Sequence, residues 1–424
     1  MNTPTRSILR AGLLMSTPGE PLQRHCNVHL VDGRIEAVTD DPPGETSAPA
    51  EVPVLDLSNY CVMPGLIDSH VHSLYEVGNR SIADFVTRSD ADLALQGVHF
   101  TRKLLEAGFT TLRDLGNMQG SDAIYSLRDA IVNGLIPGPR IVGVGAFISP
   151  TGGGGDIGGL RPDVCCVVKS SGICDGADAC RRSVREQIKR GADVVKIILT
   201  GSVLSNSRSG LGVQFHEDEL QAIVDTAHLM GRPVAVHAHG AEGVKAALRA
   251  GVDSVEHASS LDDEAIELFS RSNAFLVPTL LAVHTVSELA QREGYYPEAI
   301  REKARLLGRT SRENLSRARQ AGIKIAFGTD SGVFPHGQGA RELALMVDAG
   351  FTAAQAIESA TVRAAQLLGL ASEVGTLAPG KWADIIAVRG DPYEDVRVLE
   401  NVRLVMARGK LAYDRRDEEQ SAVN

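Results

Sequence analysis

Long apolar runs are missing from this 424-residue chain. No stretch approaches the roughly 18 consecutive apolar residues that a membrane-spanning helix needs. The short apolar stretch at residues 8–15 contains Arg10 and is followed by no convincing cleavage site, so it does not have the pattern of a signal peptide. We therefore expect a cytoplasmic protein with no membrane partner.

Basic residues are also fewer than acidic ones. The chain has 43 Lys and Arg residues and 53 Asp and Glu residues, which gives a formal net charge of −10. The basic residues are scattered along the chain and form no cluster that would attract phosphate groups. This charge balance argues against nucleic acid or an anionic membrane surface as a partner.

Cysteine is sparse as well, and its spacing does not suit a structural zinc site. The six cysteines are Cys26, Cys61, Cys165, Cys166, Cys174 and Cys180. Four of them fall within residues 165–180, but they lack the paired Cys-x-x-Cys spacing that such a site uses. We expect reduced thiols, as in cytosolic proteins.

The two ends of the chain have the pattern of short β-strands. Residues 30–38 predict a hairpin, because an Asp-Gly pair, which favours a tight turn, separates two apolar runs. Residues 382–388 and 402–407 predict further strands near the other end. We expect both ends, residues 1–62 and 375–424, to form one composite β-sandwich domain.

Between the ends, apolar strands alternate with amphipathic helices. The eight predicted strands are residues 65–72, 110–115, 140–147, 194–200, 234–239, 254–257, 275–278 and 324–329. Residues 218–230 illustrate a predicted helix, with an apolar stripe and a glycine after its end. Eight such units predict an α/β fold, a (β/α)8 TIM-like barrel over residues 63–374. An open doubly wound sheet is less favoured, because no Gly-x-Gly-x-x-Gly turn follows an early strand.

Residues with ligand chemistry gather at the predicted carboxyl ends of these strands, where active sites of such barrels lie. His70 and His72 are two residues apart, so on a strand their rings point to the same side. Lys196, His237, His257 and Asp330 follow at the ends of four later strands. A single strand-end histidine is more often structural, but the whole set in this order predicts a metal site.

The order His-x-His, Lys, His, His, Asp resembles the amidohydrolase superfamily in its binuclear-metal branch. Residues 62–68, 328–332 and 380–384 are similar to the family as well, so that the resemblance covers essentially the whole chain. Residues 191–205 and 332–338 are similar to the imidazolonepropionase-like group. That group contains metal-dependent dipeptidases and carboxypeptidases, among them prolidases (Xaa-Pro dipeptidases) and Xaa-Arg dipeptidases, and it contains ochratoxin-hydrolysing amidases.

The resemblance implies two Zn²⁺ ions per chain. His70, His72 and Asp330 would hold one ion, and His237 and His257 the other. A hydroxide and Lys196, carboxylated by carbon dioxide, would bridge them. The bridging hydroxide would attack the amide carbon, with Asp330 as the proton shuttle to the leaving amine. Homo-oligomers, which are common among relatives, are expected here too.

Several nearby residues are candidates for contacts with substrate. His239 shares the inward face of His237 and is a candidate catalytic and substrate-binding residue, or else a hydrogen-bond partner of the ligands. His336 is either a substrate contact or a surface histidine. Arg208 either binds the carboxylate of the substrate or is a solvated loop residue. Arg113 and Asp114 either orient ligands or pair with each other.

The expected substrate is a dipeptide or N-acyl amino acid with a free C-terminal carboxylate, cleaved at its amide bond. A xenobiotic, toxin-like (ochratoxin) or cyclic amide would need the same chemistry. A mononuclear imidazolone hydrolase or deaminase is a further alternative, but such enzymes lack the lysine that stands here at position 196. A non-catalytic scaffold is another alternative. Gly154 departs from relatives that often carry a histidine there, so the choice of substrate is left open.

Overall fold

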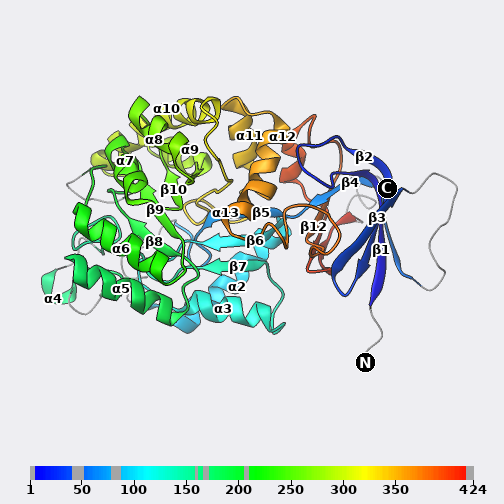
Figure 1. Ribbon diagram of the computed structural model, residues 1–424, viewed down its shortest axis with the longest axis horizontal. Coiled ribbons are helices and arrows are strands. Elements are labelled where there is room, and N and C mark those ends of the chain that lie inside the picture. Colours follow the sequence, from blue (N-terminus) through cyan, green and yellow to red (C-terminus); the bar gives the residue numbers. More distant parts are fainter. Residues whose placement is uncertain are drawn as a thin grey trace.

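The computed structural model describes residues 5–40, 52–77, 87–157, 161–165, 171–204 and 210–416. A sheet built from both chain ends lies beside a larger part in which strands and helices alternate (Figure 1). None of the helices in the described ranges is long and apolar enough to cross a membrane.

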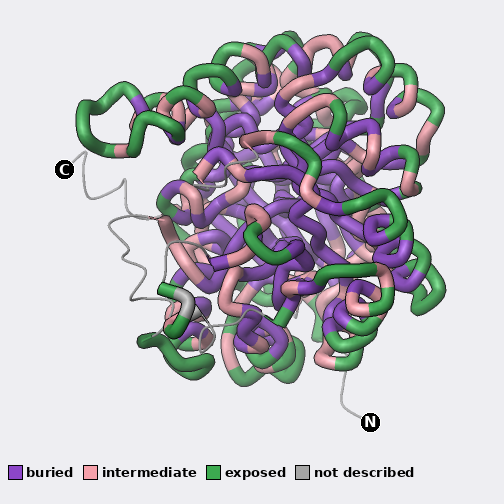
Figure 2. Tube along the Cα trace, turned by 90° about the vertical axis from the view of Figure 1, so that its left-hand side faces the viewer, coloured by how far each residue is buried: buried purple, intermediate pink, exposed green. Residues whose placement is uncertain are grey.

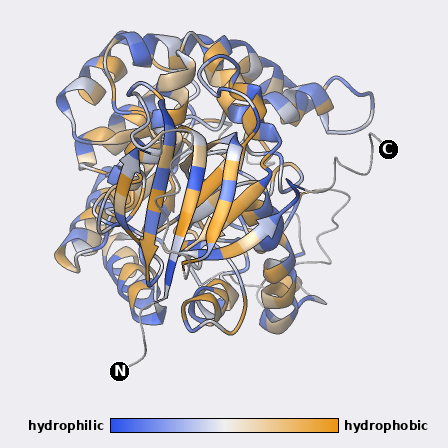
Figure 3. Cartoon of the chain, turned by 90° about the vertical axis from the view of Figure 1, so that its right-hand side faces the viewer, coloured by the Kyte–Doolittle hydropathy of each residue, from blue (hydrophilic) through white to orange (hydrophobic). Residues whose placement is uncertain are grey.

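The sheet from the chain ends has seven strands in the order β14-β13-β12-β4-β1-β2-β3. Their bounds are β1 Arg6–Leu14, β2 Gln23–Val31, β3 Arg34–Asp40, β4 Val54–Pro64, β12 Ile385–Val388, β13 Leu404–Ala407 and β14 Lys410–Asp414. The predicted hairpin turns at Asp32 and Gly33, whose φ angles of 49° and 80° are those that an Asp-Gly turn favours. Figure 3 shows hydrophilic and hydrophobic residues alternating along these strands.

Both chain ends therefore form one separate sheet, as predicted. Its strands are hydrogen-bonded into a single sheet, not into two packed ones, and it buries a core of its own that includes Leu9, Val28, Leu57 and Ile385. The predicted domain limits at residues 62 and 375 stay a prediction. The four cysteines with described side chains are free thiols, whereas the side chains of Cys165 and Cys166 lie outside the described set.

The larger part contains seven parallel strands in two sheets. They are β5 Leu66–Val71, β6 Phe109–Asp114 and β7 Arg140–Gly143 in one sheet, and β8 Val195–Ile198, β9 Val234–Ala238, β10 Ser254–His257 and β11 Phe275–Val277 in the other. Parallel bridges at Ile148–Ile197, Leu276–Ile325 and Val71–Ser331 connect the two sheets at both edges. The strands thus follow one another around a ring, as the predicted barrel requires.

The eighth predicted strand, residues 324–329, is not a regular strand. In the described part of the chain its strand pairing is limited to an isolated bridge at Ile325 and, just beyond the segment, another at Ser331. The amide of Phe327 donates to the carbonyl of Ser359, and the amide of Thr329 donates to the carboxylate of Asp68 as well as to the chain of β5. Because these amides have partners outside a ladder, a continuous strand does not form.

Helices follow the strands and cover the ring. Their bounds are α2 Asp90–Glu106, α3 Ala123–Val132, α4 Pro162–Cys165, α5 Ala177–Arg190, α6 Glu217–Leu229, α7 Ala241–Ala250, α8 Asp263–Arg271, α9 Leu280–Leu289, α10 Glu298–Gln320, α11 Arg341–Asp348, α12 Ala353–Glu358 and α13 Ala364–Leu367. A π-helical turn, Ser359–Arg363, joins α12 to α13, and a 3-10 turn spans Val396–Glu400. The helix predicted at 218–230 is α6, displaced by one residue.

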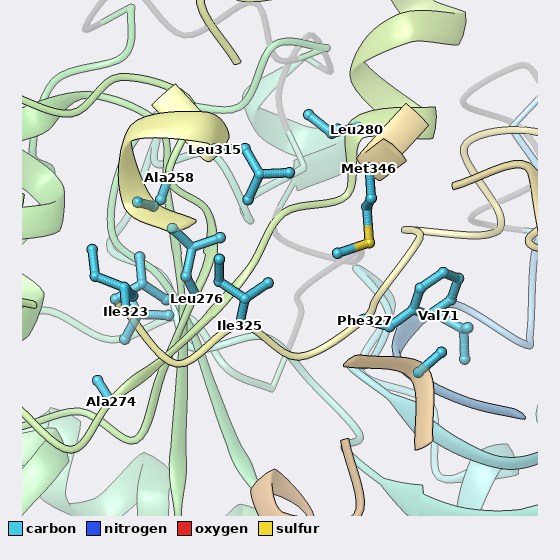
Figure 4. Close-up of a cluster of buried hydrophobic side chains, with 14 of the residues drawn as sticks. Val71, Ala258, Ala274, Leu276, Leu280, Leu315, Ile323, Ile325, Phe327 and Met346 are labelled. Carbon is cyan, nitrogen blue, oxygen red and sulfur yellow. The ribbon is translucent and has the colours of Figure 1, made fainter. Parts of the chain in front are cut away.

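Buried residues fill the inside of the ring and the layer beneath the helices, while exposed residues lie on the outer turns (Figure 2). Leu276 and Ile325 meet across the bridge that closes the ring, and Leu315 and Met346 of the covering helices belong to the same buried cluster (Figure 4). This packing holds the carboxyl ends of the strands in fixed positions, and the predicted ligands stand there.

Candidate metal centre

The predicted ligands come together at one end of the ring. His70 lies on β5, His237 on β9 and His257 at the end of β10, and all three are buried. The ring centroids of His70 and His257 are 5.0 Å apart, and those of His237 and His257 are 4.5 Å apart. Two triads have potential ligand atoms within 4.8 Å of one another, namely His70, His257 and Asp330, and His237, His239 and His257.

Asp330 faces the first pair of histidines. Its Oδ1 lies 3.1 Å from His72 Nε2 and 3.5 Å from His70 Nε2. Burial alone would raise the pKa of the Asp330 carboxyl, but the positive charge that the adjacent rings of His70 and His72 carry when protonated holds it well below its usual range. Asp330 and His257 both adopt left-handed backbone conformations, with φ of 60° and 72°, a strain that often accompanies functional sites.

Hydrogen bonds at Nδ1 orient three of the rings. His72 Nδ1 lies 2.7 Å from the carbonyl oxygen of Gly116, His70 Nδ1 lies 2.9 Å from Glu256 Oε2, and His257 Nδ1 lies 2.7 Å from the hydroxyl of Thr279. Carbonyl and carboxylate oxygens only accept, so His70 and His72 carry their proton on Nδ1. Their Nε2 atoms therefore present lone pairs to the centre, as metal-ligating histidines do.

The arrangement of lone pairs calls for a cation. His72 Nε2 stands 3.1 Å from a carboxylate oxygen of Asp330, and a lone pair on this nitrogen would repel that oxygen unless a proton or a metal ion lies between them. Nitrogen and oxygen ligands of a tetrahedral zinc ion, bound at about 2.1 Å, are themselves about 3.4 Å apart. The distances from Asp330 to His70 and to His72 are therefore those of two ligands of one metal ion.

Two buried nitrogen atoms support the same conclusion. His237 Nε2 and Lys196 Nζ have no hydrogen-bond partner, although buried polar atoms nearly always have one. Burial lowers the pKa of the His237 ring well below its usual value, so that its lone pair is available. Burial also lowers the pKa of the Lys196 ammonium to about 8. The residues present thus fit a metal centre.

Glu256 is a functional residue that sequence reasoning missed. It is fully buried on β10, where Arg113 Nη2 donates to its Oε1 at 2.8 Å while its Oε2 holds His70. Burial alone would raise the pKa of Glu256, but the Arg113 guanidinium lowers it to about 2. The available signal was an acidic residue within the predicted strand Ser254–His257, since a buried charge needs a partner.

Arg113 therefore orients a predicted ligand through Glu256. Asp114 instead accepts the amide protons of Ser73 and Gly116 at 2.6 and 2.9 Å, and so shapes the loops around His72.

A pocket opens beside the second triad. The three histidines and Asp330 form one wall with Ser202, and the remaining wall is apolar, made by Val203, Leu204, Ala282, Val283, Val286, Ala304, Leu307 and Val333. His239 faces this pocket and is held by a 3.0 Å contact between its Nδ1 and the Ser259 hydroxyl. Lys303 precedes the wall residue Ala304 on α10, and its ammonium donates to the carbonyl of Ser202 at 2.9 Å.

The other predicted substrate contacts lie elsewhere. His336 does not line the pocket: it is buried behind His72, with Nε2 3.2 Å from the His72 carbonyl and Nδ1 3.0 Å from Glu76 Oε2. Arg208 lies outside the described residues. At Gly154, a β-carbon would stand 3.0 Å from Ile198 and 3.1 Å from the carbonyl of Thr200, so the glycine suits this tight turn.

Comparison with known proteins assigns the family. A model of the amidohydrolase family matches residues 61–412. The chain belongs to the amidohydrolase family. The resemblance seen in the sequence is thereby confirmed, and so is the expectation of an enzyme: the amidohydrolase is a metal-dependent hydrolase whose histidine cluster fits a metal site.

Similar proteins cover nearly the whole amidohydrolase chain. Ochratoxinase of Aspergillus niger is 33% identical over an alignment 425 positions long, which covers 94% of this chain and 84% of that protein. The structure of a Xaa-Pro dipeptidase with bound methionine has a TM-score of 0.89 at 36% identity, and covers 96% of this chain and 99% of its own. A prolidase complexed with N-methylphosphonate-L-proline has a TM-score of 0.86 at 32% identity, with coverages of 96% and 99%.

Proposed function

We propose that this amidohydrolase cleaves the amide bond of a dipeptide or N-acyl amino acid with a free C-terminal carboxylate. The observation that carries the proposal is the buried cluster in which histidine lone pairs and Asp330 converge beside an apolar pocket. A dipeptidase with bound methionine and a prolidase with a proline-based phosphonate are among its structural relatives, which supports an amino-acid-like substrate.

Two zinc ions are the proposed cofactors. His70, His72 and Asp330 would hold one ion, and His237 and His257 the other. Lys196 would bridge them after its neutral amine adds to carbon dioxide, which forms an N–C bond, releases one proton and creates a carbamate with two oxygens. The unpartnered, buried Nζ and its lowered pKa favour this reaction. Bound there, the ions would lower the pKa of water and polarise the amide carbonyl.

The protein side chains supply the remaining chemistry. The Asp330 carboxylate, kept ionised by its histidine neighbours, accepts the proton of the attacking water and passes it to the leaving nitrogen. His239, whose Nδ1 is held by Ser259, presents its other ring nitrogen to the substrate carbonyl. The apolar wall takes the side chain or acyl group, and the Lys303 ammonium takes the carboxylate.

An aromatic toxin-like amide is the second candidate substrate. Its support is the apolar pocket wall together with the 33% identity to ochratoxinase. This candidate shares the metal chemistry and differs only in the group that fills the pocket.

The test is metal content per chain by mass spectrometry, followed by hydrolysis of dipeptide, N-acyl amino acid and aromatic amide libraries. We expect two zinc ions and turnover of substrates with a free carboxylate. In Lys196→Ala we expect loss of zinc and activity, with partial rescue of activity by short carboxylic acids. One zinc in the unaltered protein, or unchanged zinc in Lys196→Ala, would contradict the bridged pair and favour a mononuclear imidazolone hydrolase or deaminase.

A further inference from the structure

A second cavity lies at the end of the barrel opposite the histidine cluster. It has a volume of about 360 Å³, within the range of small-molecule sites. Its walls include Arg140 at the start of β7, Val194 just before β8, and Arg232 and Pro233 just before β9. Because the histidines stand at the carboxyl ends of parallel strands in the same ring, the cavity and the metal centre occupy opposite ends.

The cavity is unusually cationic for a chain with a net negative charge. Four arginines line it, Arg113, Arg128, Arg140 and Arg232, against the single carboxylate of Asp193. That carboxylate is already engaged, because it accepts from Arg128 Nη1 at 2.8 Å and from the amide of Gly143 at 2.9 Å. No carboxylate in the lining is left to neutralise the other three guanidinium groups.

Carboxylates beyond the lining satisfy two of them. Arg113 pairs with Glu256 at 2.8 Å, and Arg140 pairs with Asp384 at 3.2 Å. Within the part of the chain that the structure describes, Arg232 makes no ion pair. A half-buried guanidinium without a counterion is the first sign that a ligand completes this cavity.

Two unpartnered donors are the second sign. Arg140 Nε and Arg232 Nε are both buried and lack a hydrogen-bond acceptor. A buried donor on a charged group costs free energy when it stays unpaired, so such atoms are rarely left alone. Two of them on the walls of one cavity indicate that an acceptor enters from outside, and guanidinium groups select carboxylate or phosphate oxygens.

The rest of the wall is apolar. It consists of Ile141, Val142, Val194, Pro233, Leu367, Leu368 and Leu370. An inorganic ion would leave this surface uncovered, whereas an anion with an apolar body would bury it. From the charge, the unpartnered donors and this wall, we propose that the cavity is a binding site for a small organic carboxylate with an apolar body, separate from the metal centre.

Arg232 is the residue to change, because it has no ion pair whose loss would disturb the fold. Benzoate is titrated calorimetrically into the metal-loaded full-length protein, with methyl benzoate and inorganic phosphate as comparison probes. We expect saturable benzoate binding that is at least about tenfold weaker in Arg232→Gln. Arg319→Gln is the matched control, because Arg319 Nε is also buried and unpartnered but does not line the cavity; benzoate should bind it as it binds the unaltered protein.

A second variant fills the cavity without removing charge. Leu368→Trp adds bulk to the apolar wall and should abolish benzoate binding while every arginine remains. Thermal unfolding establishes that each variant is folded.

Three results would overturn the proposal. One is the absence of detectable binding at benzoate concentrations up to about 10 mM. The second is binding that persists unchanged in both Arg232→Gln and Leu368→Trp, which would assign benzoate to the zinc centre. The third is methyl benzoate or phosphate binding as tightly as benzoate, which would contradict the requirement for a charge joined to an apolar body.

Discussion

At the scale of single residues, the metal centre combines neutral imidazoles with ionised carboxylates. Burial, with Lys196 nearby, lowers the pKa of His70 to about 4, and burial lowers that of His239 to about 3. Near neutral pH these rings therefore carry a free lone pair, while Asp330 stays charged. The rings of His70 and His239 are thus already neutral, which is the protonation state that a metal ligand needs, so ion binding displaces no proton from them.

The proposed proton transfer predicts the behaviour of Asp330→Asn. An amide cannot accept the proton of water or return it to the leaving nitrogen, so we expect kcat to fall about 10³-fold. The change is nearly isosteric, and thermal unfolding and zinc content are measured alongside the rate. Asp218→Asn, in the exposed first turn of α6, is the control. A zinc-loaded Asp330→Asn enzyme with near-normal kcat would exclude Asp330 as the shuttle.

Lys303→Met tests how the substrate carboxylate is recognised. If the ammonium binds this group, its loss should raise KM about tenfold for a substrate with a free carboxylate and change kcat little. The same substrate with a C-terminal amide should show no such difference between the two proteins. Lys410→Met, on the exposed strand β14, is the control. An equal rise in KM for acid and amide would indicate a packing role for Lys303.

At the scale of elements, strand positions were predictable from apolar runs, and the seven regular strands of the ring lie where expected. The irregular backbone of the eighth segment, residues 324–329, was not predictable. Its pattern of residues resembles a strand, but two of its amides bond to Ser359 and Asp68. The pattern of apolar residues predicts which side chains are buried, but it does not predict which acceptor each backbone amide binds.

The candidate ligands were predictable for a similar reason. Their positions at strand ends follow from alternation and from the parallel arrangement of the strands. Glu256 was not predictable in its role, since it acts through Arg113 and His70, which are 143 and 186 residues away in sequence. Contacts of this kind depend on the radius and stagger of the ring, which no local pattern contains.

The start of helix α9 gives a prediction for pH. Glu342 is fully buried on α11, and its two carboxyl oxygens accept from the amides of Leu280 and Leu281 at 2.8 and 2.5 Å. Burial raises its pKa to about 8, above the ordinary value of 4.5. Between these values the folded protein binds a proton that the unfolded chain releases. Its contribution to stability is therefore complete below about pH 4.5 and is lost as the pH rises towards 8, by at most about 1.4 kcal/mol per pH unit.

Glu342→Gln should remove this pH dependence, because the amide resembles the protonated acid and does not titrate. Denaturant unfolding of both proteins between pH 5 and 8 gives the free energy of unfolding as a function of pH. The pH dependence that Glu342 causes is the difference between the slopes of these two curves. Parallel stability curves over this range would show that Glu342 is ionised in the folded protein and acts as an ordinary cap of α9.

At the scale of the whole molecule, the barrel carries different chemistry at its two ends. The metal centre lies at the carboxyl ends of the strands, and the arginine-lined cavity lies at their amino ends. Arg113 belongs to both, because it lines the cavity and holds Glu256, which in turn holds His70. The same ring of parallel strands therefore connects the two places through a short chain of buried contacts.

Metal removal should lower the stability of the whole molecule, since the centre joins strands from both sheets of the ring. Without a metal ion, the 3.1 Å contact between His72 Nε2 and the Asp330 carboxylate needs a proton, and His237 Nε2 stays unpartnered. Zinc at about 100 times its Kd stabilises the folded state by about 2.7 kcal/mol, which corresponds to a rise in Tm of roughly 3 °C. Thermal unfolding of chelated and zinc-loaded protein measures this rise. His237→Gln should reduce it, whereas His228→Gln, which alters a partly exposed ring beside Asp253, should leave it intact. A Tm that is independent of zinc would mean that the ring closes without help from the metal.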